Sequence, residues 1–191
     1  MIPLPAIAQE RTLFDFDTVD HGGYGAVVAK LTSINNEAAM MVGGRGGWIV
    51  NHMVAIGGGG YGLVSSVHSR VIGPLGERFV QLGYGGLDLE IIVRSDELVH
   101  FSVHTLVGGG SVGFRNSMQD DWFGNHYDNN SHSDGFFVAE PGINLDLNVT
   151  PWFRASAGVT YRYVGGLSSE ILNNVDLRGP SGILSFRFGK F

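Results

Sequence analysis

The stretch 38–66, AAMMVGGRGGWIVNHMVAIGGGGYGLVSS, decides the fold that we expect for this chain. Two apolar, glycine-rich runs flank Asn51-His52, and a polar pair containing Asn is typical of a two-residue β-hairpin loop. With that loop, Arg45 lies opposite Gly58, and Tyr61 lies opposite Val42. One face of the hairpin then carries a single charge among glycines, and the other face is apolar with aromatic ends.

These two faces indicate which side of the sheet is inside. A soluble sheet turns its apolar face inward and its charges outward. Here the crowded residue is Arg45, and the flanking glycines of the same face, Gly43, Gly47 and Gly60, leave room for its guanidinium. The pattern favours a narrow barrel with a polar interior and an apolar exterior.

Composition limits the alternatives. A chain of 191 residues is typical of one domain, and its 30 glycines are spread through apolar runs, as in a strongly curved sheet. The absence of cysteine excludes disulfides and thiolate metal sites. A net charge of −6 argues against nucleic acid as a partner.

The N-terminal segment reads differently from the rest. Ala6-Ile7-Ala8 before Gln9 resembles a signal-peptidase site, although Met1–Pro5 is too short for an apolar signal core. We interpret residues 1–21 as a signal-peptide remnant with a lead-in, or as an ordinary N-terminus, and residues 22–191 as the barrel domain. No apolar run reaches 18 residues, but barrel strands are only about 10 residues long and alternate.

We expect eight strands joined by connections of alternating length. The strands are predicted at residues 23–34, 37–50, 53–66, 78–94, 99–114, 136–149, 153–165 and 181–191. Connections at 51–52, 94–98 and 150–151 are tight, whereas those near 66–77, 115–135 and 166–180 are long, with a helical turn possible at 168–175. Pro141 suggests a bulge within its strand. Short turns at one end and long loops at the other are typical of outer-membrane barrels.

Strict alternation along the strands assigns the two faces. The polar face predicts an interior network of paired charges, with Lys30 as a further member: Arg45, Asp88, Glu90, Glu140, Asp146, Arg154, Arg162 and Arg187. The apolar face carries aromatic residues near both expected rims, as in an interfacial girdle: Trp48, Tyr61, Trp152, Phe153, Tyr161 and Tyr163. An eight-stranded barrel is just wide enough for its side chains to fill, so we expect a closed interior.

The C-terminal strand LSFRFGKF, with its alternating aromatics and final Phe191, resembles the small outer-membrane β-barrels, the class of the OmpA transmembrane domain and OmpX. The resemblance implies an all-β, eight-stranded antiparallel up-and-down transmembrane barrel in the cell outer membrane. It also implies outer-membrane lipid and the barrel-assembly machinery as partners, and it carries no activity and no cofactor. Strict alternation puts Lys190 on the apolar face, so a bulge at Gly189-Lys190 would be needed to bring Phe191 there.

Two groups of residues suggest further chemistry. His100, Ser102 and His104 share one face near Asp88 and Glu90, the residue types of a hydrolase triad, but they point into a crowded interior. Loop 115–135 carries Asp and His residues that match no known metal spacing. The same loop offers aromatic candidates for surface contacts: Trp122, Phe123 and Tyr127.

The sequence therefore predicts a non-catalytic outer-membrane barrel with a closed polar interior and long surface loops. Two alternatives remain open. A lipid-modifying outer-membrane enzyme, a deacylase or acyltransferase, would need an opening beside Ser102. A soluble lipocalin-like binder would line a cavity with the apolar face.

Overall fold

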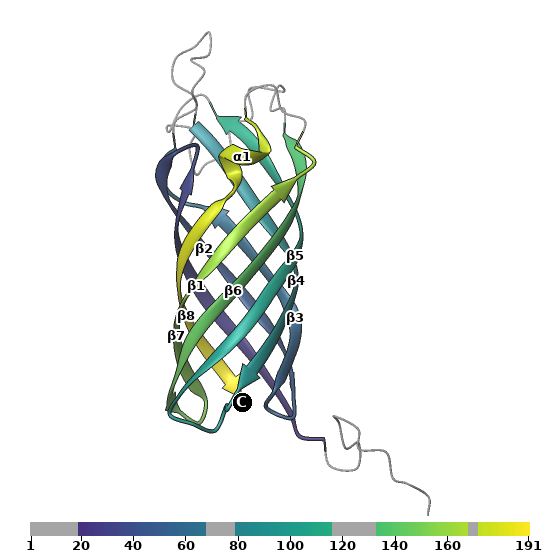
Figure 1. Cartoon of the computed structure of the whole chain (residues 1–191), viewed down its shortest axis with the longest axis vertical. Helices are drawn as coiled ribbons and strands as arrows, with labels where there is room; N and C mark the ends of the chain where they lie inside the picture. The colour runs from purple at the N-terminus through teal and green to yellow at the C-terminus, as the bar shows by residue number, and fades with distance from the viewer. Residues whose placement is uncertain (1–18, 68–78, 116–132, 168–171) are drawn as a thin grey trace, which may run out of the picture.

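The computed structural model describes residues 19–67, 79–115, 133–167 and 172–191, which form one closed antiparallel barrel (Figure 1). Each strand pairs with its neighbours in chain order, and β1 closes the barrel against β8. The elements are β1 His21–Ile34, β2 Glu37–Val50, β3 Val54–Leu63, β4 Phe79–Val93, β5 Val99–Arg115, β6 Asp134–Thr150, β7 Phe153–Gly165, α1 Asn174–Leu177 and β8 Gly179–Lys190. The predicted eight-stranded up-and-down barrel is confirmed.

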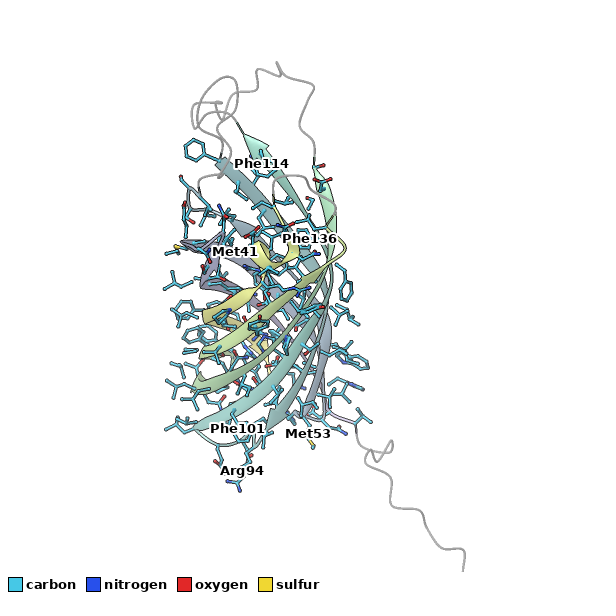
Figure 2. All side chains as sticks on the ribbon, turned by 45° about the horizontal axis from the view of Figure 1, so that its top comes forward. Met41, Met53, Arg94, Phe101, Phe114 and Phe136 are labelled. Carbon is cyan, nitrogen blue, oxygen red and sulfur yellow. The ribbon has the colours of Figure 1, made fainter. Side chains whose placement is uncertain are left out.

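The two ends of the barrel differ. The tight connections after β2, β4 and β6 lie at one end together with the C-terminus, and α1 lies at the other end (Figure 1). We call these the turn end and the loop end. Figure 2 shows Arg94 and Met53 at the turn end, with Phe114 near the loop end. The helical turn expected at 168–175 shares only residues 174 and 175 with α1, and residues 168–171 lie outside the described residues.

The hairpin that decides the fold differs from the expected register by one residue. Its loop has three residues, because Val50 pairs with Val54 and the Met53 N–H donates to the Val50 carbonyl at 3.1 Å. Asn51 and His52 both have positive φ, 52° and 57°. A shift of one residue turns every side chain of β3 to the opposite face. The expected pairing of Arg45 with Gly58 is therefore wrong, and Arg45 pairs with Gly59.

The expected bulge at Pro141 is also wrong. The pairing between β6 and β7 keeps the same register on both sides of Pro141, from Ala139–Tyr163 to Gly142–Thr160. The irregularity lies instead at Asn148–Thr150, next to the tight turn. A proline removes one backbone donor, and the ladder continues past that single gap.

Glycines allow neighbouring strands to approach closely on the inner side of β2–β5. A Cβ placed on Gly57 would lie 2.0 Å from the Gly46 carbonyl oxygen, and one on Gly108 would lie 2.1 Å from that of Gly85. Any other residue at these two positions would have to displace backbone. The glycines therefore permit the sharp curvature of this part of the wall.

The barrel interior has three layers, and this corrects the expectation of a uniformly polar core. Towards the loop end, a buried apolar cluster includes Ile34, Met41, Phe136, Leu172 and Leu177. Most of the buried charged groups lie nearer the turn end, although Val28, Leu106 and Ile183 of the cluster reach in among them. At the turn end, a smaller apolar cluster of Tyr24, Ile49, Ala55 and Ile92 follows. The strands end near α1 with apolar inward residues, because Leu172 and Leu177 of the β7–β8 connection pack on them.

The exterior of the barrel is apolar, as expected. Large exposed side chains occur on every strand, for example Val27, Ile56, Leu89, Phe101, Leu145, Val159 and Phe186. Figure 2 shows Phe101 pointing away from the barrel near the turn end. In the part of the chain that the structure describes, the large apolar side chains of this face point away from the barrel interior, which argues against the lipocalin-like alternative.

Candidate functional site

The structure places the eight predicted network residues, and Lys30, inside the barrel. All nine are buried: Lys30, Arg45, Asp88, Glu90, Glu140, Asp146, Arg154, Arg162 and Arg187. They come from six of the eight strands, β1, β2, β4, β6, β7 and β8, because the inward positions of neighbouring strands meet at similar heights along the barrel axis. We call this group the interior ion network.

Glu140 is the most connected member of the network. It forms a short ion pair with Lys30 and accepts hydrogen bonds from the Tyr84 hydroxyl and, at 2.7 Å, from the Thr160 hydroxyl. The Lys30 Nζ also lies 3.3 Å from the centroid of the Tyr61 ring. A buried carboxylate with three donors is well compensated for the loss of water.

A second group forms around Arg187. Its Nη2 lies 2.8 Å from a Glu90 oxygen and 3.6 Å from an Asp146 oxygen. Asp146 also accepts hydrogen bonds from the hydroxyls of Ser102 and Ser156. These contacts join β4, β5, β6, β7 and β8 across the interior.

Arg45, in the central hairpin, forms a longer ion pair than Arg187 does with Glu90. Its Nη1 lies 3.4 Å from an Asp88 oxygen, within the part of the wall that is built from glycine. A Cβ on Gly59, its cross-strand neighbour, would lie 3.1 Å from the Arg45 Cβ. The glycines therefore make room for the arginine, as the sequence indicated.

Arg154 and Arg162 differ from the expectation of mutual ion pairing. Arg162 donates to the backbone carbonyls of Leu177 and Ser33, at 2.7 and 3.3 Å. Arg154 donates to the Ser95 carbonyl at 3.3 Å and stacks on the Phe191 ring at 4.1 Å. Within the described residues, neither arginine forms a salt bridge with a carboxylate. Arg162 thus binds α1 at the loop end through Leu177, and Arg154 binds the tight turn after β4 at the turn end through Ser95.

The proposed hydrolase triad does not form. The Ser102 side chain is fully buried, and its hydroxyl donates to Asp146 at 2.7 Å. His104 contacts the Asn144 amide at 3.0 Å, and His100 contacts the Glu97 carbonyl at 3.2 Å. The serine therefore has a carboxylate as its acceptor and no histidine positioned as a base.

Five of the six expected girdle residues lie on the outside of the barrel. Trp48, Trp152, Tyr161 and Tyr163 are exposed, and Phe153 is half-buried. The ring of Phe153 stacks on Phe188 at 5.0 Å near the turn end. Tyr61 is a correction: it is 6% exposed and lies inside, next to Tyr84, because the three-residue loop turns β3 over.

The C-terminal residue does not need the bulge that we expected. Strict alternation continues to the end of β8, so Lys190 is exposed, and Phe191 packs on the inner apolar cluster near Tyr24. Sequence reasoning did not assign several inward polar side chains as partners of the network: Tyr24, Ser156 and Thr160. Their inward position was visible in the alternation, but their charged partners lie on other strands.

A separate polar group lies outside the barrel at the turn end. The Asp20 carboxylate contacts the Lys190 ammonium and the His52 ring, each at 3.0 Å. The Asn51 N–H also donates to the Asp20 carbonyl at 2.9 Å. The hydrogen bonds from Lys190 and His52 hold the pKa of Asp20 below its usual value of 3.8. This group ties Asp20, just before β1, to both the hairpin loop and Lys190 near the C-terminus.

We expect this attachment to depend on pH in a defined direction. Because the folded pKa of Asp20 is depressed, its contribution is present above the ordinary value of 3.8 and is lost as pH falls through the folded value. NMR titration of the Asp20 carboxyl should give a midpoint below that of a model aspartate, and Lys190→Ala should move it upward. An unchanged midpoint in Lys190→Ala would contradict the contact.

The loop candidates Trp122, Phe123 and Tyr127, with most of loop 115–135, lie outside the described residues. Within the ranges that the structure describes, no group of three or more His, Cys, Asp or Glu side chains is placed to hold a metal ion. In the same ranges, no helix has the length and apolar character to cross a membrane.

Comparison with solved structures shows the fold. Neisserial surface protein A (NspA) aligns over 91% of this chain and 99% of its own, with 13% identity and a TM-score of 0.59. Ail, the attachment invasion locus protein of Yersinia pestis, aligns over 88% and 97%, with 14% identity and a TM-score of 0.50. That structure is a complex with the heparin analogue sucrose octasulfate, and Ail is an outer membrane protein. The predicted resemblance to small outer-membrane β-barrels is confirmed at the level of the fold.

No protein-family model matches this chain. A search of curated proteins also finds no match.

Proposed function

We propose that this chain is an outer-membrane β-barrel with a closed interior and no catalytic activity, which acts at the cell surface through its loop end. The carrying observation is the distribution of polarity: a closed barrel whose outer belt is apolar and whose charges are buried inside. In water such an exterior would be a large aggregation-prone surface, whereas an outward apolar band matches the hydrocarbon of a bilayer.

The packing of the interior supports the proposal that it is closed. The apolar cluster that contains Leu172 and Leu177 lies at the loop end, and Phe191 packs on the smaller cluster at the turn end. The interior ion network lies between them, with its charges engaged by other side chains or by backbone carbonyls. An interior filled in this way supports a structural role for the charges and no transport path.

The surface role rests on the loop end and on the general kind of the two similar barrels, NspA and Ail. The sulfated ligand of Ail is not carried over to this chain. A highly anionic sugar is disfavoured by a chain with a net charge of −6, unless basic residues gather locally. The partner class is therefore proposed only as a cell-surface contact through the loops.

The test is cell fractionation followed by gel electrophoresis with and without boiling. We expect the chain in the outer-membrane fraction, and we expect the unboiled protein to migrate differently from the boiled protein, because a closed barrel resists detergent. Recovery without detergent and an unshifted band would contradict the membrane placement.

The enzyme alternative has its own test. If Ser102 were a nucleophile, Ser102→Ala would abolish lipid turnover by the purified barrel in vesicles. The buried Ser102 hydroxyl and its bond to Asp146 support the opposite expectation, that the parent chain and Ser102→Ala show the same background turnover.

A further inference from the structure

The barrel wall opens between β3 and β4 at the loop end. Gly62 and Gly83 form the last pair of these strands. Beyond it, the N–H groups of Val64 and Ser65 donate to the Met40 carbonyl at 3.0 and 3.3 Å, so the chain turns towards β2. It returns at Val67, whose carbonyl accepts from the Val80 N–H at 2.9 Å. Residues 63–66 and 81–82 therefore frame a gap in the ladder.

This gap is a cavity of about 410 Å³, which we call the wall notch. It is lined by segments 62–66 and 79–83, with Ser111, Gly113 and Phe114 of β5 and with Ser133. The volume is within the range of small-molecule sites, about 300–1,000 Å³. Among the described lining residues there is no ionisable side chain.

The polar groups of the wall notch are neutral. Gln81 pairs with Gly113, and Ser111 pairs with Gly83, so the two polar side chains are neighbours on the outer face. Both are exposed. An amide and a hydroxyl together offer donors and acceptors to a hydroxylated ligand and give no charge to attract an anion or a cation.

The wall notch lies at the position along the barrel axis where the head group of a membrane amphiphile would lie. Ser111 pairs with Gly135 of β6, and the next outward residue towards the turn end is the exposed Phe137. On the other side, the exposed Met40 binds the end of β3 through its backbone. The wall notch therefore lies at the loop-side edge of the apolar belt, where lipid heads meet chains.

A shallow trough continues from the wall notch into the apolar belt. Outward-facing glycines pair across the strands, Gly44 with Gly60, Gly60 with Gly85, and Gly85 with Gly109. Exposed Leu87 and Val107 stand beside them. Because glycine has no side chain, this glycine trough is one side chain deep, and an alkyl chain in it gains contacts on several sides.

We propose that the wall notch binds the head of a neutral, hydroxylated single-chain amphiphile, with its alkyl chain along the glycine trough. The cavity and its uncharged hydrogen-bonding groups define the head, and the trough defines the tail. This proposal rests on the proposed function. The glycine trough lies on the outer face of the barrel, so an alkyl chain enters it from the surrounding lipid.

The experiment uses the full chain in phosphatidylcholine vesicles with a dodecyl glucoside that carries a photoreactive diazirine in its alkyl chain. We expect cross-links concentrated on residues 58–66, 81–87 and 107–113. Gly62→Phe fills the wall notch, and a Cβ at position 62 meets no atom within 4 Å. This variant should reduce the labelling of those segments about tenfold.

Gly182→Phe is the matched control, because Gly182 faces outward on β8 and its Cβ also meets nothing within 4 Å. It should leave the labelling unchanged. Gln81→Leu with Ser111→Ala keeps the cavity but removes its polar groups, and it should lower the labelling by the glucoside. Boiling-dependent gel mobility verifies that each variant is folded.

Three results would overturn the proposal. Labelling that is even around the barrel would show no site, and equal labelling by dodecyl phosphate with the same diazirine would show no preference for a neutral head. Unchanged labelling in folded Gly62→Phe would place the site elsewhere. Flotation with the vesicles separates the two proposals: a chain that floats but lacks the site contradicts only this inference, whereas a chain that does not float contradicts both.

Discussion

Glu140→Gln should lower the free energy of unfolding by about 3–5 kcal/mol, the range for removing one partner of a buried ion pair. Glu140 is the carboxylate shared by Lys30, Tyr84 and Thr160. Without its charge, the Lys30 ammonium stays buried with no carboxylate partner and keeps its contacts with the Tyr61 ring and the Tyr84 hydroxyl. Urea unfolding in phosphatidylcholine vesicles, followed by tryptophan fluorescence, measures the change.

A double-mutant cycle separates the pair from its surroundings. Lys30→Met should cost a similar amount, and the double variant should cost clearly less than the sum of the two single changes, because the second change removes the unpaired charge. The exposed pair of Arg94 and Glu97, at 3.2 Å, supplies the control. Glu97→Gln should change stability by less than about 1 kcal/mol. Additive losses for Lys30 and Glu140 would show that the two side chains do not interact.

Leu145→Arg is the second large effect. Leu145 is 59% exposed on the outer face of β6, between Phe101 of β5 and Ala157 of β7. In a bilayer, an arginine near the midplane of a barrel's lipid face costs about 2–4 kcal/mol. The same vesicle unfolding experiment should show this loss relative to the parent chain.

The depth dependence provides the control for this prediction. Leu98 is exposed in the tight turn between β4 and β5, where an arginine reaches the polar interface. Leu98→Arg should therefore cost only about 0–1 kcal/mol. Equal effects of the two substitutions would mean that Leu145 does not face lipid, and a neutral Leu145→Arg would contradict the assignment of the outer face.

Alternation alone was enough to predict the eight strands and most of their faces. The largest error in a strand end is three residues, at the end of β3. The side-chain period of a strand is 2, so a residue such as Asp88 or Glu140 is assigned inward by its apolar neighbours in the same strand. This local rule placed all eight predicted charges inside, and Phe191 as well, where alternation needed no bulge.

Sequence patterns within one strand did not predict the register of the central hairpin, because that register depends on pairing with other strands. The loop of the central hairpin takes three residues, which places Tyr61 inside against Lys30 and Tyr84. Asn51-His52 is compatible with either loop length, so the register is decided by the pairing of β3 with both of its neighbours.

The identity of each partner was likewise decided only by closure of the barrel. Lys30 and Glu140 are 110 positions apart, and Arg162 meets the carbonyls of α1 and β1 in place of a carboxylate. The alternation determines that these groups point inward, because that depends on neighbours along one strand. Which of them meet, and where the wall opens between β3 and β4, depends on register and height around the whole barrel, and only the tertiary structure sets these.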